Sequence, residues 1–166
     1  MESGEAVVET LNPVEVEVIQ LFAQLSHALG QPPSVGEIYG LLFISPQPMT
    51  MDDLIERLRL SNGSASQGLK YLRELGAVRI VEVAGARRTH YEAAAELRKL
   101  AGNFLRQQIS PHLLDSRTRL EQIAENAQQL TGEARKHTLA RIKLLQSWER
   151  NGRRVLPFML KLLVGR

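Results

Sequence analysis

Residues 61–93 constrain the fold most strongly, because the sequence marks both ends of one short helix. Ser61 can cap the helix, since its hydroxyl can accept a hydrogen bond from a backbone N–H group of the first turn. Gly76 stands where a helix commonly ends in the left-handed conformation that glycine adopts most easily. Between them, leucines recur at intervals of three: Leu69, Leu72 and Leu75. We therefore expect a helix with one buried face and one polar, cationic face.

The residues after this helix predict two short strands joined by a basic turn. The segment 78–83 is rich in β-branched residues and partly alternating, and residues 89–93 form a second short segment. The connection between them contains glycine and two adjacent arginines, Arg87 and Arg88. The tip of the predicted hairpin is therefore suited to meet anions.

Another short helix is predicted immediately before residue 61, so that the pair forms a helix-turn-helix and the basic hairpin forms its wing. Thr50 can cap this helix, and Asp53 follows three residues later, as in a capping box. Its apolar positions are Met51, Leu54, Ile55 and Leu58. The turn into the second, recognition helix falls at residues 60–63.

Two further helices are predicted nearer the N-terminus. Asn12 and Pro13 mark the start of the first. We expect its buried stripe to consist of Val18, Ile19, Phe22, Leu25 and Leu29. Ser34 can cap the second, from residue 36 to residue 44, whose nearly continuous apolar character indicates burial.

Four motifs occur in order along residues 28–93. They are Gly36-x-Ile38-Tyr39-Gly40-Leu41-Leu42, Leu60-Ser61-x-Gly63-x-x-Ser66, Leu72-Arg73-Glu74-Leu75-Gly76-x-Val78-Arg79 and Gly85-x-Arg87-Arg88-x-x-Tyr91-Glu92-Ala93. The ordered set resembles the GbsR/MarR family of bacterial transcriptional regulators. The resemblance implies a homodimer that binds paired DNA half-sites. In each half-site the recognition helix enters the major groove and the wing lies near the DNA backbone.

On that basis seven polar residues of the recognition helix and wing receive an expected role. We assign base reading to Ser64, Ser66 and Gln67, and phosphate contact to Ser61, Lys70, Arg87 and Arg88. Small residues at the start of the helix, Gly63, Ala65 and Gly68 among them, are expected to allow close approach to DNA. The family further implies a repressor whose affinity a small molecule modulates.

The distribution of charge agrees with a polyanionic partner. The net charge is only +3, but residues 1–56 carry −9 with no Lys or Arg, whereas residues 57–166 carry +12. Such asymmetry suggests a DNA-facing surface that begins near Arg57. The alternative, that these bases only solvate helix faces, applies to most of them, and the cluster at positions 70, 73, 79, 87 and 88 is the exception.

The C-terminal half is predicted to be helical throughout, with an interruption at Ser110-Pro111 that is either a kink or a new helix capped by Ser110. Apolar residues keep a three-four spacing beyond it: Leu113, Leu120, Ile123, Ala127 and Leu130, then Leu139, Ile142, Leu145 and Trp148. These stripes either fold back on their own domain or pair with a second chain, and we favour pairing.

The expected fold is thus mainly α with a small β-hairpin. Its parts are a disordered N-terminal tail at residues 1–11, a winged helix-turn-helix DNA-binding domain at residues 12–93, and a helical dimerisation region at residues 94–166. The apolar segment 155–164 is expected to dock on the dimer core rather than on a membrane.

A small-molecule effector is the least defined part of this expectation. Some relatives are associated with choline and glycine betaine metabolism, where aromatic faces can hold a quaternary ammonium. The aromatic candidates are Tyr91, Phe104 and Trp148, with Phe158 beside them. Core packing is the stronger interpretation of each, so the effector stays unassigned.

Several classes of function find no support in the sequence. The chain has no cysteine, and its four histidines show no metal-binding spacing. Residues 63–70 only superficially resemble a phosphate-binding loop, because no Ser or Thr follows Lys70. No apolar run approaches the length of a membrane span, and no leader is visible. We expect a cytoplasmic protein without cofactor, metal or catalytic activity. The open alternative is a winged helix that docks only proteins.

Overall fold

The computed structural model describes residues 11–164, which divide after Glu96 into two compact units. The first unit holds the predicted helix-turn-helix, and the second contains only helices. The tail predicted for residues 1–11 lies outside the described residues, apart from Leu11.

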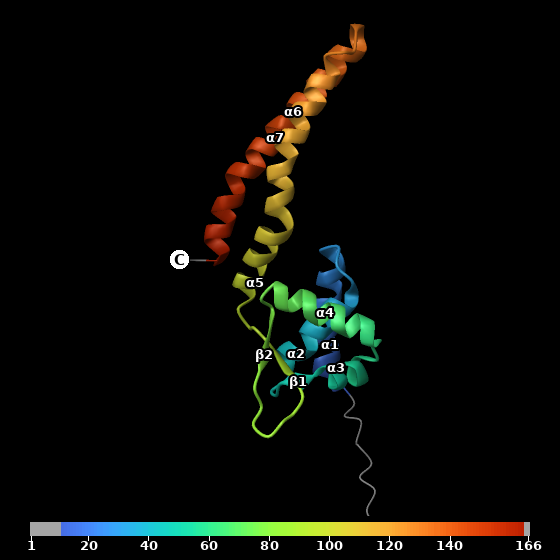
Figure 1. Ribbon diagram of the computed structural model, residues 1–166, viewed down its shortest axis with the longest axis vertical. Helices are drawn as coiled ribbons and strands as arrows, with labels where there is room; N and C mark the ends of the chain where they lie inside the picture. The colour runs from blue at the N-terminus through green and yellow to red at the C-terminus, as the bar shows by residue number, and fades with distance from the viewer. Residues whose placement is uncertain (1–10, 165–166) are drawn as a thin grey trace, which may run out of the picture. The chain divides into compact units, whose positions relative to one another are not determined.

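The first unit contains four helices and three short strands (Figure 1). In chain order they are α1 (Pro13–Ala28), α2 (Pro33–Ile44), β1 (Met49–Thr50), α3 (Met51–Leu58), α4 (Asn62–Glu74), β2 (Val78–Val81) and β3 (His90–Ala93). The pair α3 and α4 is the predicted helix-turn-helix, and β2 with β3 is the predicted wing. The winged helix-turn-helix is therefore confirmed.

The wing belongs to a three-stranded antiparallel sheet rather than to an isolated hairpin. The strand order is β1-β3-β2, with Met49 opposite Tyr91 and Val78 opposite Ala93. The predicted hairpin is present, and the additional strand β1 was not predicted because it has only two residues, too few for an alternating pattern to appear. Because β1 leads directly into α3, its pairing with β3 connects the wing to the start of α3.

Helices α1 and α2 approach so closely that side chains are excluded from part of their contact. A Cβ atom on Gly36 would lie 2.1 Å from the backbone oxygen of Phe22, and one on Gly40 would lie 3.0 Å from the Cα of Ile19. Two glycines four residues apart lie on one helix face. The four-residue spacing of the two glycines therefore lets the backbones of α1 and α2 come into direct contact. This contact fixes the point at which α1 crosses α2.

The recognition helix α4 packs on α2 through another glycine. A Cβ atom on Gly68 would lie 2.6 Å from Cδ1 of Ile38, and Ala65 is fully buried. These two small residues therefore serve the core, and the expectation that they let DNA approach was wrong. Ile38, Leu41 and Leu54 are the largest fully buried side chains, so the core lies where α2, α3 and α4 meet.

The predicted N-terminal caps of α1, α3 and α4 are confirmed. Asn12 and Thr50 form capping boxes with Glu15 and Asp53, and the Ser61 hydroxyl accepts from the backbone N–H of Ser64 at 3.1 Å. Gly76 adopts φ +74° after α4. Helix α2 differs, because it begins at Pro33 after Pro32 and has no side-chain cap, so Ser34 does not have the predicted role.

The buried stripe of α1 is narrower than its sequence pattern indicated. Ile19 is buried, but Leu25 and Leu29 are 49% and 54% exposed. Val14 and Leu21 are exposed too, so α1 carries an uncovered apolar face in this unit. Aromatic residues instead fill the α1–α2 contact, where the ring centroids of Phe22 and Tyr39 are 4.9 Å apart.

Arg57 forms a buried ion pair, which the distribution of charge along the sequence did not indicate. Its guanidinium donates to both carboxylate oxygens of Glu15 at 3.0 Å, and both side chains are almost completely buried. Because Glu15 also accepts from the backbone of Asn12, one carboxylate holds the start of α1 against α3. The DNA-facing surface therefore does not begin at Arg57 as predicted.

The second unit is a helical hairpin in which α6 and α7 run side by side (Figure 1). Its elements are α5 (Leu97–Phe104), the π-helical turn η1 (Leu105–Ile109), α6 (Ser110–Ala127) and α7 (Gly132–Val164). Residues 128–131 separate α6 from α7. Residues 155–164 continue α7 through Pro157 and are not a separate docking helix.

The Ser110-Pro111 interruption is neither a new cap nor a break. The chain passes from α5 to α6 through the wider π turn, and the Ser110 hydroxyl donates backward to the carbonyl of Leu105 at 3.2 Å. Proline lacks an N–H group and its ring crowds the carbonyl four residues earlier, so a wider turn accommodates it. The helix therefore continues past the proline.

We predict that Gly36→Ala lowers the free energy of unfolding by about 2 kcal/mol or more, because the new methyl group would collide with the backbone of α1. Gly63→Ala is the matched control, since its Cβ would lie no closer than 3.9 Å to Ser61 Oγ. Urea unfolding of both variants checks this. Equal stability of the Gly36→Ala variant and the original chain would contradict the close crossing.

We also predict a pH-dependent role for Tyr39, whose hydroxyl donates to the carbonyl of Ala94 at 2.9 Å. Burial raises the pKa of Tyr39 from 10.0 to about 12. The folded state therefore holds the proton more tightly, and this stabilisation is present below pH 10 and lost as pH rises through 12.

Tyr39→Phe should reduce stability by about 1 kcal/mol at pH 8 through loss of the hydrogen bond. It should also abolish the additional loss of stability that the original chain shows between pH 10 and pH 12. Urea unfolding at pH 8 and pH 11 measures both effects. A variant that loses stability with pH as steeply as the original chain would exclude Tyr39 as the titrating group.

Candidate nucleic-acid interface

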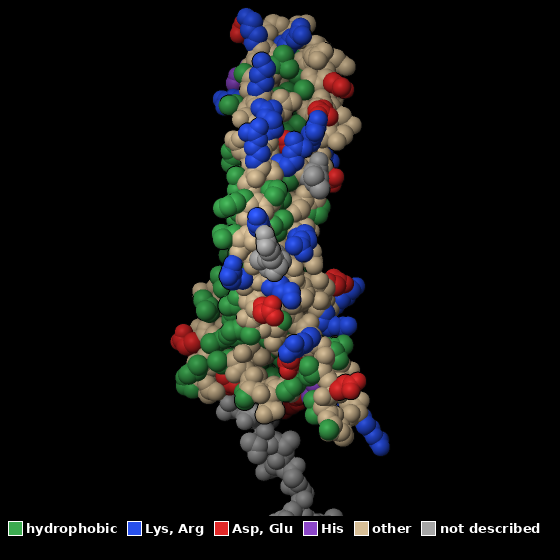
Figure 2. All heavy atoms as spheres, turned by 90° about the vertical axis from the view of Figure 1, so that its left-hand side faces the viewer, with side chains coloured by type: hydrophobic (Ala, Val, Ile, Leu, Met, Phe, Trp, Pro, Cys, Tyr) green, Lys and Arg blue, Asp and Glu red, His purple; other side chains and the backbone are tan. Residues whose placement is uncertain are grey.

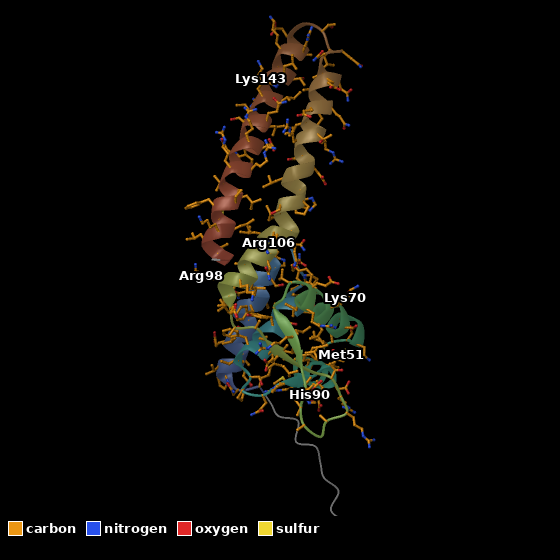
Figure 3. All side chains as sticks on the ribbon, turned by 60° about the vertical axis from the view of Figure 1, so that its left-hand side comes forward. Met51, Lys70, His90, Arg98, Arg106 and Lys143 are labelled. Carbon is orange, nitrogen blue, oxygen red and sulfur yellow. The ribbon has the colours of Figure 1, made fainter. Side chains whose placement is uncertain are left out.

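The recognition helix α4 presents a polar face opposite its leucines. Ser66, Gln67, Lys70 and Arg73 are exposed on it, whereas Leu69 and Leu72 are buried. Figure 3 shows Lys70 on α4 and His90 at the start of β3. Gln67 and Lys70 stand three residues apart and are neighbours on the helix surface. This face can therefore offer an amide and an ammonium side by side.

The serines at the start of α4 differ in whether their hydroxyl groups are already hydrogen-bonded within the protein. Ser61 Oγ accepts from the Ser64 backbone and donates to Ser64 Oγ at 2.9 Å, so both hydroxyl groups take part in the helix cap. Ser66 is exposed. Ser61 and Ser64 consequently support the helix first, and Ser66 with Gln67 form the more accessible pair.

The two arginines of the wing are in different states. Both are exposed, but Arg88 donates to the carboxylate of Asp52 at 2.7 Å, whereas Arg87 forms no ion pair with any residue that the structure describes. Asp52 lies in the first turn of α3. The Arg88 pair thus links the wing to the helix-turn-helix, and Arg87 is the cation that an external anion meets first.

Two other cations of this surface are paired with carboxylates of the same or the neighbouring element. Lys70 lies 4.0 Å from Glu74 one turn along α4, and Arg79 on β2 is paired with Glu92 on β3. Such exposed pairs contribute little to stability, since solvent screens them. They also lower the local positive potential, so the net charge of the face is smaller than the number of bases suggests.

Arg59 was not predicted at this surface, whereas Arg73 was predicted as part of the cationic cluster but received no contact role; both are exposed. Arg59 lies in the turn between α3 and α4 and adopts a left-handed conformation with φ +53°. A side chain with Cβ rarely occupies that region. Its position in the turn was the available signal, because it places a cation next to the N-terminus of the recognition helix.

Tyr71 on α4 is not part of the exposed polar face. It is half-buried, and its hydroxyl lies in the interior without a hydrogen-bond partner among the described residues. Burial raises the pKa of Tyr71. Tyr71 therefore contributes to the packing of α4 rather than to its exposed surface.

The aromatic candidates for an effector site do not converge. Tyr91 belongs to the first unit, and Phe104 and Trp148 belong to the second, where Trp148 lines an apolar groove that does not include Phe104. The rings that do cluster are Phe22, Tyr39 and Phe43, with centroids 4.9 to 5.8 Å apart. That cluster is part of the α1–α2 contact, so it gives no independent support for a ligand site.

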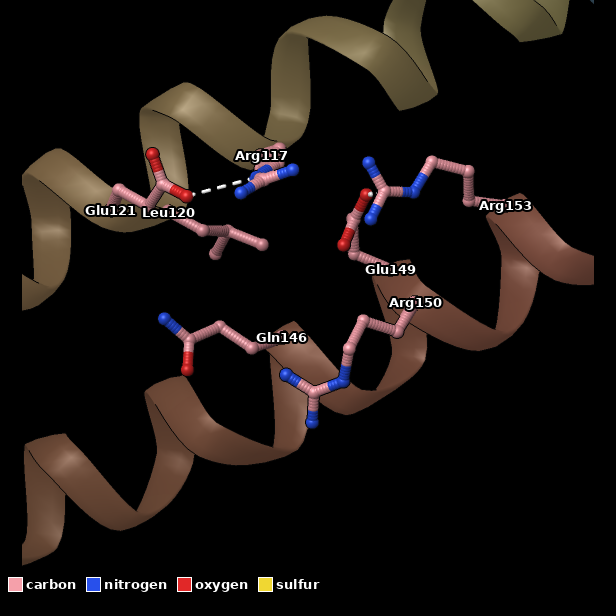
Figure 4. Close-up of a pocket in the computed structure, with 7 residues that line it drawn as sticks. All are labelled: Arg117, Leu120, Glu121, Gln146, Glu149, Arg150 and Arg153. Atoms are coloured by element: carbon pink, nitrogen blue, oxygen red, sulfur yellow. Dashed lines mark hydrogen bonds and ion pairs between the residues drawn. The ribbon is translucent and has the colours of Figure 1, made fainter.

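A polar pocket of about 230 Å³ lies between α6 and α7 (Figure 4). The Glu149 side chain is 7% exposed at its centre, 3.5 Å from Nε of Arg153, while Arg117 on α6 pairs with Glu121 at 2.9 Å. The hydrogen bond and charge of Glu121 raise the pKa of Arg117. Glu149 therefore faces inward, and it fixes which side of α7 is turned toward α6.

Within residues 11–164 we find neither a group of acidic and histidine side chains able to hold a metal ion nor a helix suited to crossing a membrane. The polar groups collected on α4 and the wing are thus the best-defined candidate site of the first unit.

Comparison with known proteins agrees with this geometry. A model of the MarR family matches residues 24–89, which run from the last turns of α1 to the tip of the wing. The HTH-type transcriptional repressor GbsR of Bacillus subtilis (strain 168) is 32% identical over 87 residues, which cover 52% of this chain and 48% of that protein. Over its winged helix-turn-helix the chain is similar to MarR/GbsR-type regulators.

Two other proteins extend the MarR/GbsR-like comparison. The putative HTH-type transcriptional regulator YvaV of B. subtilis (strain 168) is 22% identical over 143 residues, covering 83% of this chain and 81% of its own. The HTH-type transcriptional repressor OpcR of the same strain is 24% identical over 53% of this chain. The chain spans about half the length of GbsR and OpcR.

A solved structure described as a crystal structure of a transcriptional regulator shares the fold. It superposes with a TM-score of 0.59 and 17% sequence identity, and the match covers 93% of this chain and all of the other. The fold shared with that structure therefore includes the helical unit as well as the winged helix.

We predict that Arg59→Gly raises the free energy of unfolding by about 1 kcal/mol, because glycine adopts positive φ without strain. Arg59→Ala is the control, since it removes the same charge but keeps the Cβ atom. Urea unfolding distinguishes the two variants. Equal stabilisation by both would show that charge, and not backbone conformation, limits stability at this turn.

Proposed function

We propose that this MarR/GbsR-like protein is a sequence-specific, double-stranded DNA-binding repressor that acts as a homodimer without catalytic chemistry. The observation that carries the proposal is the exposed amide and cation pair on α4, next to a wing whose Arg87 has no carboxylate partner among the described residues. An amide can read an adenine edge, and an unpaired guanidinium suits phosphate.

The residues divide by role in this proposal. Gln67, with Ser66 and Ser64, reads bases in the major groove, while Ser61, Lys70, Arg87 and Arg88 hold the phosphate backbone. Arg59, in the turn before α4, and Arg73, in the last turn of α4, add further cations. Arg88 must first leave Asp52, so Arg87 supplies the larger share of the wing's attraction for DNA.

The repressor role is proposed from the similarity to the repressors GbsR and OpcR, each matched over about half its length. Modulation by a small molecule is proposed on the family resemblance, and Tyr91, Phe104 and Trp148 remain its aromatic candidates. Such a ligand can act only by binding the DNA-competent and incompetent arrangements with different affinity.

A second candidate, a winged helix that docks a protein, is favoured by one observation. Lys70, Arg79 and Arg88 each lie beside a carboxylate, which reduces the cationic character of the face. The two candidates differ in their response to salt, because DNA binding releases counterions and protein docking on a near-neutral face does not.

We predict that fluorescence anisotropy on DNA from upstream of the gene shows a preference over a scrambled duplex of roughly a thousandfold or more, with a steep salt slope. Gln67→Ala should change the preferred sequence at one position by about 1–3 kcal/mol. Arg87→Ala should weaken all duplexes nearly equally and reduce the salt slope by about one.

Arg135→Ala is the matched control for charge, because Arg135 is exposed at the start of α7, outside the winged unit. It should leave both affinity and salt slope close to those of the original chain. An intact slope in Arg87→Ala would remove the wing from the interface. Weak binding with a flat salt response on both duplexes would favour the protein-docking candidate instead.

A further inference from the structure

The Glu149 carboxylate lies at the centre of the polar pocket between α6 and α7 with part of its hydrogen-bonding capacity unused (Figure 4). Its side chain is 7% exposed. Its Oε1 atom accepts no hydrogen bond from any residue that the structure describes, although Nε of Arg153 lies 3.5 Å away. A buried acceptor that has lost its water and gained no donor is costly. The pocket therefore has a place for a donor from outside the chain.

The basic side chains around Glu149 make the pocket positive. Three arginines line it, Arg117, Arg150 and Arg153, against the two carboxylates of Glu121 and Glu149, so that their charges sum to +1. Arg117 is paired with Glu121 and Arg153 lies beside Glu149, whereas Arg150 forms no ion pair with any residue in the described part of the chain. Arg150 is therefore available to bind an anion.

The charge of the whole helical unit favours a negatively charged ligand. Residues 97–166 contain fourteen Lys and Arg and only five Asp and Glu, a net charge of +9. Figure 2 shows Lys and Arg side chains gathered over the helical hairpin, with few acidic side chains among them. A surface of one sign raises the local concentration of ions of the opposite sign. Anions should therefore be concentrated near the pocket.

The size and lining of the pocket restrict the ligand to a small polar molecule. Its volume of about 230 Å³ lies below the roughly 300 Å³ at which pockets for drug-sized ligands begin. The amide of Gln146, which can both donate and accept, lines it one turn before Arg150. Among the described residues no aromatic ring lines it, so it lacks the cage that a quaternary ammonium requires.

We propose that this pocket binds an acidic amino acid, such as glutamate or aspartate. The ligand's ammonium group donates to Oε1 of Glu149, and its two carboxylates bind the guanidinium groups of Arg150 and Arg117. The ligand's net charge of −1 neutralises the +1 of the pocket. An ammonium fits this acceptor better than a hydroxyl, because hydrogen bonds between ionised groups are roughly twice as strong as neutral ones.

The pocket is separate from the apolar groove of the same hairpin, which Trp148 lines. The groove and the pocket share only Leu120 and Glu149. Successive residues of a helix are about 100° apart, so Gln146 and Arg150 lie on the side of α7 away from Trp148. The two sites therefore open on opposite edges of the α6–α7 contact, and coverage of the groove would leave the pocket accessible.

The first test is isothermal titration calorimetry of the full-length protein with L-glutamate and with L-aspartate, in the absence of DNA. We expect one site per chain with a Kd of about 1 mM or tighter. Glutarate lacks only the ammonium group, and 4-aminobutyrate lacks only the α-carboxylate. Each should bind about tenfold or more weakly than L-glutamate. Glutarate that binds as tightly as L-glutamate would show a simple anion site and overturn the proposal, as would the absence of binding by both amino acids.

The second test places the ligand in the pocket. Glu149→Gln keeps the size of the buried side chain, and Arg150→Gln changes an exposed residue, so both variants should fold, which circular dichroism verifies. Each should weaken L-glutamate binding about tenfold or more. Arg154→Gln is the matched control, because Arg154 is exposed on the same helix and does not line the pocket. It should leave the Kd unchanged.

The outcomes bear on this site alone. Undiminished binding in either pocket variant, or equal weakening in Arg154→Gln, overturns the assignment of the ligand to the pocket. Weakening in both pocket variants with an unchanged Arg154→Gln establishes it. The inference goes beyond the proposed regulator, and because no DNA is present in these titrations, its failure leaves that proposal intact.

Discussion

The backbone contact between α1 and α2 is the constraint on which the winged unit depends. Gly36 and Gly40 leave no room for side chains against Phe22 and Ile19, so the crossing point has one solution. Helix α2 then offers Ile38 to Gly68 of the recognition helix. The orientation of the polar side of α4 is thus set by steric exclusion two helices away, within a core whose packing density allows little adjustment.

Much of this arrangement could be predicted from local chemistry. Caps at Asn12, Thr50 and Ser61 and the left-handed Gly76 depend on neighbours within a few residues, so the sequence displays them directly. Strand β1 escaped prediction because two residues carry no period. The partners of Arg57 and Arg88 escaped because they lie 42 and 36 residues away, and composition does not distinguish a buried base from a solvated one.

The same limit explains the errors on apolar stripes and small residues. Periodicity locates a helix face but does not say what covers it, so Leu25 and Leu29 were assigned to a core that leaves them exposed. Gly68 and Ala65 were assigned to DNA approach because small residues permit either kind of close contact, and only the position of α2 decides between them. The sequence therefore predicts the chemical character of a helix face better than it predicts what packs against that face.

The Arg88–Asp52 pair affects how any measured salt dependence should be interpreted. An arginine that is already paired with a carboxylate exchanges one anion for another when it binds phosphate. The released carboxylate then attracts cations from solution. The ions released by the DNA are then partly recaptured by the protein. A count of phosphate contacts taken from the slope would consequently fall below the number in the complex.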